Sequence, residues 1–518
     1  MKKVLSAGGA LLMGSAVMSK LLGLLRDRLL VSHFPGEELD WVFAAFRIPD
    51  FFFFLLVGGT VSTLFLPRAV ELDHLERKKF FSSFLWLVVV VFGLFCLAGA
   101  LWPEFFVQMF ATGFSAAERI EIADLVRWLF GSVFLLSVSS VFSASQQARQ
   151  KFLSVALAPV LYTGGICAGI FFWAGSFGME AVGWAAVAGA SVHLLVNVVA
   201  HFLGKQSLTF AWKKPRRAWQ KFTSDFSFRT ANNAAFQINL SADIWIGSFL
   251  IAGSIGAFQL GMNLAFASFT VVGIPLASAA FPRLTQAKRD PAEQKKIVRD
   301  TLRWIAILSV PAALALAIGA NFWLRFLFGV DGELLRMGTP LLQIMALSVP
   351  FACAIPLLSR VYMANDDVRT PMKFSAISIG LATATAAVLS LVILPDETAV
   401  LGLAIGTVVA NLLSAILFGT GVWRRFQRQK NDGLHPRHRS SSSASDPTIG
   451  CRRGFPDCDE KSWSNKIYDL GNAGKNGGDP AMVGLCAGKV SGKNYCLGDP
   501  ARRKIYRDRK SGGHHSKT

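Results

Sequence analysis

Residues arranged for metal binding or covalent chemistry are scarce in this sequence. Only 7 of its 518 residues are Cys, and the four in the C-terminal tail lack the paired C-x-x-C spacing of zinc modules. A membrane glycosyl- or phosphotransferase would need clustered carboxylates to hold Mg²⁺. The acidic pair Asp366-Asp367 instead lies in a short basic loop typical of a helix connection. We therefore predict that the protein is not an enzyme and has no catalytic residues and no metal site.

The chain is also short of charge, which excludes an ordinary soluble fold. Charged residues make up 17% of the sequence and hydrophobic residues 52%, with 43 Phe and a mean hydropathy of +0.43. One or two soluble cores cannot bury that much apolar surface. Apolar stretches of about 20 residues can cross a bilayer as helices. Twelve are predicted, at 4–31, 43–65, 80–101, 123–143, 153–173, 181–202, 230–251, 255–281, 304–328, 341–362, 372–394 and 399–423.

Lys and Arg are distributed asymmetrically over the loops between these segments. With both termini placed in the cytoplasm, the inner segments hold 29 of these cations and the clear outer loops hold Arg119, Arg325 and Arg336. This is the positive-inside pattern of a multi-pass membrane protein. No small-residue cleavage site follows the first segment, so we expect it to be retained as a helix. The net charge of +20 then reflects loops near anionic membrane lipids, and nucleic-acid binding is not expected.

Two weak internal repeats divide the apolar region. Pro67 and Pro282 lie at the ends of two segments, 215 residues apart, and Arg149 and Arg369 lie in two short loops, 220 residues apart. Chance matches in a biased composition are the alternative explanation. Taken together, the repeats predict an all-α polytopic membrane protein of about 12 transmembrane helices in two parallel six-helix lobes around a central cavity.

The predicted domains follow from this division. The N-terminal lobe covers 1–203, a basic cytoplasmic linker covers 204–229, and the C-terminal lobe covers 230–430. The remaining residues, 431–518, begin with a Ser run and are rich in Gly, Lys, Arg and Asp without apolar periodicity. This composition predicts a disordered cytoplasmic tail.

Charged side chains inside the first segment indicate a binding site, because charges are costly within a bilayer and usually functional. Lys20 is the deepest, and Asp27 lies about two helical turns later on the same face. An ion-pair cluster that ties the first two helices together is the structural alternative. We favour a cavity for an anionic substrate, with guanidinium groups placed to bind a diphosphate bidentately. The predicted substrate-binding residues of this lobe are Lys20, Arg26, Asp27, Arg28, Asp40 and Arg47.

The second lobe offers polar residues without positive charge. Asn232, Asn239 and Asp243 fall within about 40° of each other on a helical wheel, and Gln259 and Asn263 are four residues apart and therefore adjacent. Such residues often join helices to one another. The functional interpretation is a neutral, hydrogen-bonding wall for sugar or peptide groups that includes Asn263. Asp243, a carboxyl without an evident cation nearby, and Asn239 would then couple transport to Na⁺, H⁺ or the membrane potential.

Three stretches of the sequence resemble a known family, the MurJ/MviN lipid II flippases of the multidrug/oligosaccharidyl-lipid/polysaccharide exporter superfamily. The resemblance covers about residues 1–425, and its most specific parts are the first and the third stretch. They are Ser19-Lys20-Leu21-Leu22-Gly23-Leu24-Leu25-Arg26-Asp27, then Asp40 with Ala45-Phe46-Arg47-Ile48-Pro49-Asp50 and Phe65-Leu66-Pro67, and finally Arg360 to Ala364 with Asp367 to Lys373.

The resemblance implies a two-lobed inner-membrane protein that flips an undecaprenyl-diphosphate-linked peptidoglycan precursor outward through a cavity lined by arginines. Arg26 and Asp40 match the family positions, and Lys20 stands where the family usually has arginine. Three family charges are missing, because an arginine falls at Phe53, a glutamate at Gly58 and another arginine at Asn263. Phe53 and Gly58 remove opposite charges together, so no orphan charge is left buried. The chain is therefore identified as a divergent member.

The sequence leaves several functions open. The first is a flippase for a lipid-linked peptidoglycan precursor, whose partners are that lipid-linked glycan and the membrane lipids. The second is an exporter of another lipid-linked polysaccharide or a multidrug-type exporter, and the third is a scaffold that keeps the fold without transport. No cofactor is expected beyond a coupling ion, and the oligomeric state is not predicted.

Overall fold

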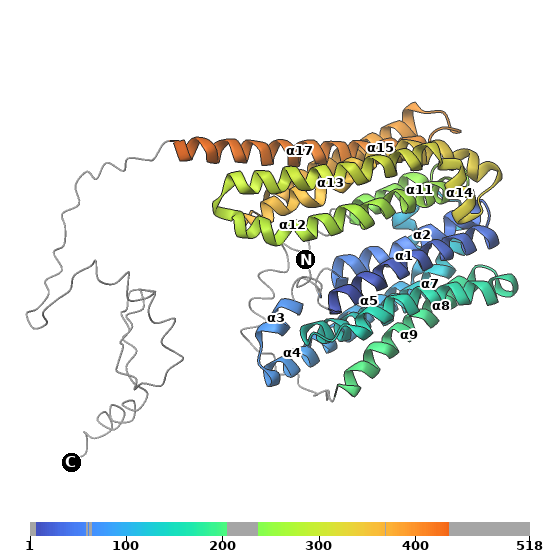
Figure 1. The fold of residues 1–518 in the computed structure, drawn as a ribbon. Coiled ribbons are helices and arrows are strands. Elements are labelled where there is room, and N and C mark those ends of the chain that lie inside the picture. The colour runs from blue at the N-terminus through green and yellow to red at the C-terminus, as the bar shows by residue number, and fades with distance from the viewer. Residues whose placement is uncertain (1–6, 59–60, 62–64, 205–236, 368, 435–518) are drawn as a thin grey trace, which may run out of the picture. The chain divides into compact units, whose positions relative to one another are not determined.

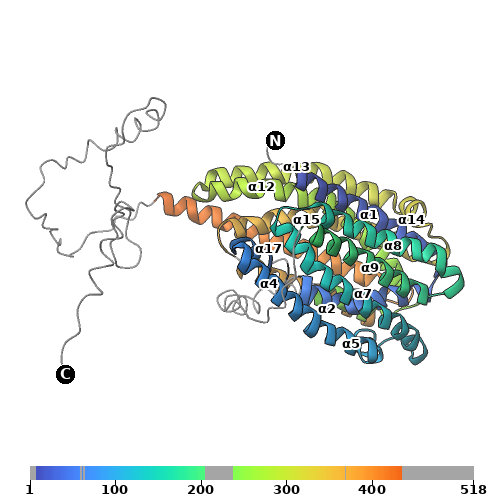
Figure 2. The same cartoon turned by 90° about the horizontal axis from the view of Figure 1, so that it is seen from below.

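A computed structural model describes residues 7–58, 61, 65–204, 237–367 and 369–434 of the chain. Every regular element among these residues is helical. Nine of the described helices are long and apolar enough to cross a membrane, which confirms the predicted all-α membrane fold. Residues 205–236, which include most of the predicted linker together with Asn232 and Asn233, lie outside the described residues, as do residues 435–518 of the predicted tail. The ribbon is shown in Figure 1 and, turned by 90°, in Figure 2.

The long helices overlap the predicted segments, but several extend beyond them: α15 begins at Gly332 and not at 341, and α17 ends at Leu434 and not at 423. Breaks with π-helical or 3₁₀ geometry are labelled η, and a further helix covers 237–247. The first half of the chain contains α1 (Ala7–His33), α2 (Glu37–Phe52), η1 (Phe53–Gly58), α3 (Leu66–Glu71), α4 (His74–Leu87), η3 (Val88–Phe92), α5 (Gly93–Leu101), α6 (Pro103–Phe110), α7 (Ala116–Ala148), α8 (Leu153–Phe177) and α9 (Glu180–Leu203). The second half contains α11 (Ser254–Ser268), η4 (Phe269–Gly273), α12 (Ile274–Gln286), η5 (Ala287–Arg289), α13 (Pro291–Ile318), α14 (Ala320–Phe328), α15 (Gly332–Ala364), α16 (Arg369–Val388), η6 (Leu389–Ile393) and α17 (Leu401–Leu434).

The predicted segment 304–328 is divided in the structure. The apolar stretch 304–328 is not a single helix, because α13 begins earlier, at Pro291, and ends at Ile318, where Gly319 separates it from the short α14. The Gly319 amide and the Trp323 indole both donate to the Ala315 carbonyl, at 3.0 and 2.9 Å, so the end of α13 stays hydrogen-bonded. Hydropathy alone does not reveal such a break, since both helices are apolar.

The two halves contain matching elements in the same order. Helices α7 and α15 both have 33 residues, and α15 begins 216 residues after α7. Each is followed two residues later by a left-handed residue, Gln150 or Asp366. The helices α2 and α11 both follow a glycine with positive φ, and both lead into a π-helical turn. This agreement supports parallel lobes. It makes Asn365 the residue equivalent to Arg149, whereas the sequence repeat paired Arg149 with Arg369.

Each half of the chain forms the main part of one hydrophobic core. The first core is built mainly from α2 to α9, and the second from α11 to α17. Residues of α11 and α14, including Leu260 and Phe328, pack into the first core and so join the halves. These contacts lie near the end of the bundle at which α1 ends and α2 and α11 begin, hereafter the α1–α2 end. In Figure 1, α1 and α2 lie beside α11 and α14.

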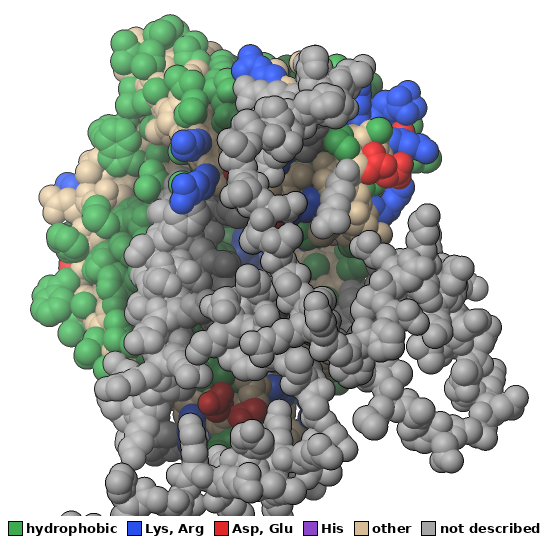
Figure 3. All heavy atoms as spheres, turned by 90° about the vertical axis from the view of Figure 1, so that its left-hand side faces the viewer, with side chains coloured by type: hydrophobic (Ala, Val, Ile, Leu, Met, Phe, Trp, Pro, Cys, Tyr) green, Lys and Arg blue, Asp and Glu red, His purple; other side chains and the backbone are tan. Residues whose placement is uncertain are grey.

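The opposite end of the bundle carries basic side chains. It is the end at which α4 and α13 begin and at which α7 and α9 end. Figure 3 views this end, and Lys and Arg side chains are prominent on the described part of its surface. Apolar side chains cover the flank beside it. This separation of basic ends from apolar flanks is typical of a membrane-spanning bundle.

The close packing of α8 on α9 depends on glycines. A Cβ atom added at Gly189 in α9 would lie 2.6 Å from the Tyr162 carbonyl oxygen of α8. We expect Gly189→Ala to lower the stability by about 1–3 kcal/mol, because the helices would have to separate. Gly175→Ala in α8 is the control, since its Cβ would meet nothing within 4 Å. Thermal unfolding in detergent measures both, and equal midpoints for the two variants would contradict the expectation.

Candidate functional site

The charges of α1 form a chain that reaches the second half of the protein. Arg26 binds Asp27 with two nitrogens, at 3.0 Å from Nε and 2.6 Å from Nη2 to Oδ1. The other carboxyl oxygen of Asp27 accepts a hydrogen bond of 2.7 Å from the Asn263 amide in α11. Asp27 is 1% exposed. Three predicted site residues, two on α1 and one on α11, are thus directly connected.

Lys20 lies about two turns before this chain. It is half-buried and within electrostatic range of Arg26 and Asp27. Lys20 forms no hydrogen bond or ion pair with any described residue. It is therefore a membrane-embedded cation that is free to meet an anion. Arg28 points elsewhere, because its Nη1 donates to the Phe326 carbonyl of α14 at 2.8 Å and its side chain is exposed.

Asp40 ties the first residues of α2 to the first turn of α11. Its carboxyl oxygens accept hydrogen bonds from the backbone amides of Gly253, at 2.8 Å, and Gly256, at 2.6 Å. The first amides of a helix lack partners within the helix, so a carboxyl group is well placed to satisfy them. Asp40 is 3% exposed, which shields these hydrogen bonds from water. Asp40 therefore joins the two halves at the α1–α2 end.

Arg47 reaches across to the helix at 237–247. Its Nη2 donates to the Gln237 side-chain oxygen at 2.5 Å, and its buried Nε has no hydrogen-bond partner. Arg47 also lies within electrostatic range of Asp50 and Asp243. The expectation that Asp243 lacks a nearby cation is therefore wrong. The cation belongs to the other half of the chain, and sequence spacing does not reveal such a neighbour.

The positions at which family charges are missing are filled differently. Phe51 and Phe52, which precede Phe53, pack edge to face or tilted against aromatic rings of α5 and α6, and Phe53 itself contacts Phe54. Gly58 ends the π-helical turn η1. Asn263 uses its amide where the family has a cation, and its donor still satisfies Asp27. The replacement at Asn263 thus leaves Asp27 hydrogen-bonded, and Phe53 adds no charge that would need a partner.

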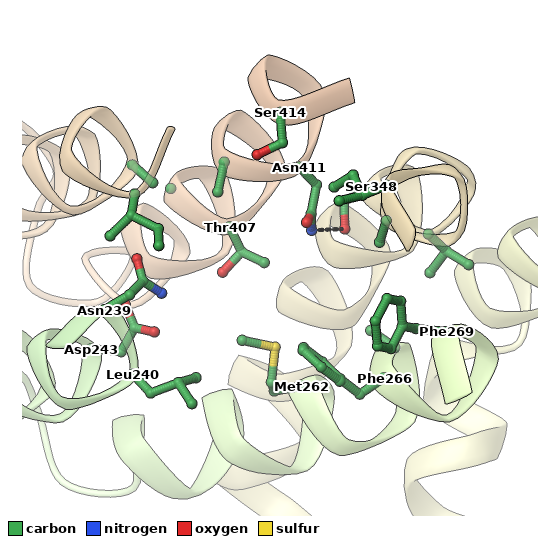
Figure 4. Close-up of a pocket in the computed structure, with 18 of the residues that line it drawn as sticks. Asn239, Leu240, Asp243, Met262, Phe266, Phe269, Ser348, Thr407, Asn411 and Ser414 are labelled. Carbon is green, nitrogen blue, oxygen red and sulfur yellow. Dashed lines mark hydrogen bonds between the residues drawn. The ribbon is translucent and has the colours of Figure 1, made fainter. Parts of the chain in front are cut away.

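A cavity of about 240 Å³ lies within the second half. It is enclosed by the helix at 237–247 together with α11, α15, α16 and α17. Figure 4 shows Asn239 and Asp243 on one side, Thr407 toward the middle, and Met262, Phe266 and Phe269 opposite. Asp243 is 6% exposed, and its Oδ2 has no hydrogen-bond partner. Asn239 accepts a hydrogen bond of 3.4 Å from Thr383.

Several polar residues of this cavity were not predicted from the sequence. Asn411 donates to the Ser348 hydroxyl at 3.2 Å, and Thr407 and Ser414 lie on the same helix as Asn411. Single Ser, Thr or Asn residues in apolar helices usually bond within their own helix or join helices. Only their position in the lining of the same cavity as Asp243 marks them as part of a site. The cavity offers oxygen atoms of the kind that bind a small cation.

Comparisons with known proteins agree with this architecture. A family model described as Lipid II flippase MurJ matches residues 36–441. A probable lipid II flippase MurJ of Thermotoga maritima is 25% identical over 372 residues, which are 70% of this chain and 76% of that protein. Another, of Rhizobium meliloti, is 26% identical over 446 residues, covering 82% and 81%.

Solved structures show the same fold. A lipid II flippase MurJ in an inward closed conformation has a TM-score of 0.68 and 19% identity, covering 81% of this chain and 90% of that chain. An inward-facing multidrug resistance MATE family transporter has a TM-score of 0.64 and 13% identity, covering 80% and 96%.

The contact of Asp40 with α11 can be tested through the distance between the halves. We expect Asp40→Ala to open the α1–α2 end, because each buried amide left without an acceptor costs about 1–3 kcal/mol. Spin labels at the exposed positions Ser32 and Asp331, in a chain whose 7 cysteines are replaced, would report a longer distance. Asp40→Asn keeps one acceptor and should lie between. Glu37→Ala, exposed on the same helix, is the control. An unchanged distance distribution in Asp40→Ala would refute this role.

Proposed function

Because this chain belongs to the lipid II flippase MurJ family, we propose that it moves an undecaprenyl-diphosphate-linked peptidoglycan precursor across the bacterial inner membrane by alternating access. It is a multi-pass membrane transporter whose substrate is lipid-linked. The observation that supports this mechanism best is the set of polar contacts that Asp40, Asp27 and Arg47 form between the two halves. Polar contacts between lobes can be exchanged for water or substrate, whereas a continuous apolar interface cannot.

The positive-inside rule assigns the α1–α2 end to the outer side of the membrane, with both termini inside. On this assignment the described conformation is closed toward the outside. Asp40, Asp27 and Arg47 each bind a partner in the second half, at Gly253 and Gly256, Asn263 and Gln237 respectively. Opening to the outside requires these contacts to break, together with that of Arg28 with the Phe326 carbonyl. The energy for that step comes from substrate binding and ion coupling.

The anionic part of the substrate belongs near Lys20 and Arg26. Lys20 has no ion pair among the described residues, and Arg26 is held by Asp27. A diphosphate that approaches Arg26 competes with Asp27, because guanidinium groups bind phosphate and carboxylate oxygens in the same bidentate way. Release of Asp27 from Arg26 would also weaken its contact with Asn263. Substrate binding is thereby linked to the contact between the lobes.

Coupling is assigned to Asp243 and Asn239 in the cavity of the second half. Asp243 has a free carboxyl oxygen there, and Asn239 and Thr407 supply further oxygens. Na⁺ or H⁺ at Asp243 would neutralise the carboxyl group that attracts Arg47. Arg47 would then be held less strongly toward the second half. This gives an ion a direct effect on a contact between the lobes.

A related lipid-linked polysaccharide is the second candidate substrate, and one observation favours it. The family cations at the positions of Phe53 and Asn263 are absent, which leaves fewer positive groups for a diphosphate. An exporter of the multidrug type would need still less positive charge. Binding of purified protein to peptidoglycan precursor, compared with another undecaprenyl-diphosphate-linked glycan, separates these alternatives.

Removing the deep cations should abolish transport. We expect Lys20→Ala and Arg26→Ala each to lower transport about tenfold or more, because truncating one partner of a buried charge contact costs about 2–5 kcal/mol. Complementation of a flippase-deficient strain measures this, with membrane insertion checked by immunoblot. Arg127→Ala is the matched control, since Arg127 is 48% exposed and pairs with Asp124. Normal growth with both alanines present would exclude the first helix as the anion site.

Replacing Asp243 should separate coupling from binding. Asp243→Asn keeps the hydrogen-bonding shape but removes the charge, so we expect substrate binding to persist and transport to lose its dependence on a pH or Na⁺ gradient. Transport into proteoliposomes with imposed gradients measures the effect. Ser414→Ala in the same cavity is the control. If Asp243→Asn transports with unchanged gradient dependence, Asp243 only joins helices.

A further inference from the structure

A cluster of basic groups lies at the end of the first half that is opposite to the α1–α2 end. Arg77 is in the first turn of α4, Arg149 follows the last residue of α7, and Lys151 precedes α8. His201 is in the last turn of α9. The cluster is separate from the charges of α1 and from the cavity of the second half. None of these residues takes part in the transport mechanism proposed above.

The imidazole of His201 lies beside the basic groups of this cluster. The ring stacks on Phe81 at a centroid distance of 4.9 Å and meets Phe142 edge to face at 5.2 Å. Phe81 lies one turn after Arg77, and Phe142 lies two turns before Arg149, so the aromatic rings and the arginines share the same helix faces. His201 is 2% exposed, and neither ring nitrogen has a hydrogen-bond partner.

Neither arginine has an anionic partner among the described residues. Both Nε atoms are buried without an acceptor, and the hydrogen bond of the Arg77 side chain, from Nη2, goes to the Leu72 carbonyl at 2.8 Å. No carboxylate of the described part of the chain forms an ion pair with either arginine. Burial and the charge of Arg77 together lower the pKa of Arg149 from its ordinary value. Like charges brought together in a partly buried place require a counter-anion.

The second half shows that the fold itself does not need these charges. Asp73 and Asp290 cap the equivalent helices α4 and α13, which places Gln294 at the position of Arg77. The matching turns place Asn365 at the position of Arg149. There the Asn365 amide donates to the Gln294 side-chain oxygen at 3.3 Å. In the second half two neutral amides therefore form a hydrogen bond at this place. In the first half the equivalent residues are two arginines that have no anionic partner among the described residues.

Lys151 also differs in charge from its equivalent residue in the second half. Its ammonium group lies near the end of α9, because a Cβ atom on Gly204 would be 3.3 Å from Nζ. The equivalent residue after the second left-handed turn is Asp367, which pairs with Arg425 at 3.7 Å. The turn in the second half is thus acidic and paired, and the turn in the first half is basic. Three cations of the first half converge where the second half has amides and a carboxylate.

Exposed apolar side chains lie on the helix ends that carry the cluster and indicate where its anion comes from. Leu75, Leu153 and Leu203 are 60%, 68% and 79% exposed, and each lies two residues from a member of the cluster. On a helix this spacing places the apolar side chains on other faces than the basic groups. Helix ends with such apolar flanks suit the acyl chains of a lipid whose headgroup lies at the helix ends, where basic side chains meet anionic lipids.

We propose that Arg77, Arg149 and Lys151 bind the phosphate of an anionic membrane lipid, with His201 beneath it as a further hydrogen-bond donor. The free guanidinium nitrogens supply charge-assisted hydrogen bonds to the phosphate oxygens. The bound lipid would bridge the ends of α4, α7 and α9 and hold them together. By the positive-inside assignment this lipid belongs to the inner leaflet.

The test uses the full chain purified in detergent and titrated with phosphatidylglycerol, phosphatidylcholine or inorganic phosphate. Native mass spectrometry measures lipid retention, and thermal unfolding measures stability. The double variant Arg77→Gln and Arg149→Asn copies the amide pair of the second half. We expect its apparent affinity for phosphatidylglycerol to fall about tenfold or more. Lys296→Gln with Arg299→Gln, two exposed cations of α13, is the charge-matched control and should bind as the wild type does.

Stability without added lipid separates a binding role from a structural one. We expect the double variant to unfold at a temperature no lower than that of the wild type, because it loses two like charges and gains an amide pair. Retention of phosphatidylglycerol equal to wild type in the double variant would overturn the site. Stabilisation of the wild type by inorganic phosphate as strong as that by phosphatidylglycerol would overturn the lipid as its source.

Discussion

The hydrogen bonds between Asp40 and the first turn of α11 are the interaction on which the described arrangement of the two halves depends. A helix that begins within or near the bilayer leaves its first amides without partners, and few waters are available to satisfy them. Asp40 supplies the acceptors from the other half of the chain, at 2.8 and 2.6 Å. The halves cannot separate at this end until water or another acceptor replaces it. A transport cycle has to supply the free energy of that exchange.

The same constraint governs the charges deeper in the bundle. Asp27 divides its two oxygens between Arg26 and Asn263, so a single carboxyl group serves both a candidate substrate cation and a contact between the halves. Arg47 is likewise shared between Gln237 and the charge of Asp243. A ligand that changes the partner of either group necessarily changes the contact between the lobes. Binding and conformational change are thereby connected through hydrogen bonds, without a separate signalling element.

The two halves share one fold and differ in their polar chemistry. Matching helices, left-handed turns and π-helical breaks recur about 216 residues apart. Membrane-embedded cations occur on α1 and α2, whereas the cavity of the second half is lined by amides, hydroxyls and Asp243. At the opposite end an arginine pair in the first half corresponds to an amide pair in the second. The backbone of a repeat thus tolerates different side chains, and each half carries its own chemistry.

The sequence by itself determined the membrane fold, the approximate positions of the long helices, and the charged residues of α1 and α2, because hydropathy and helical periodicity are local properties. The break at Gly319 escaped prediction because apolar residues flank it on both sides. Only the tertiary structure revealed the partners. Those of Asp40 are backbone amides, which carry no residue-specific signal, and Arg47 meets Asp243 across nearly two hundred residues of chain. Residues that are brought together only by tertiary packing have no fixed spacing in the sequence. Their contacts could therefore be identified only in the folded structure.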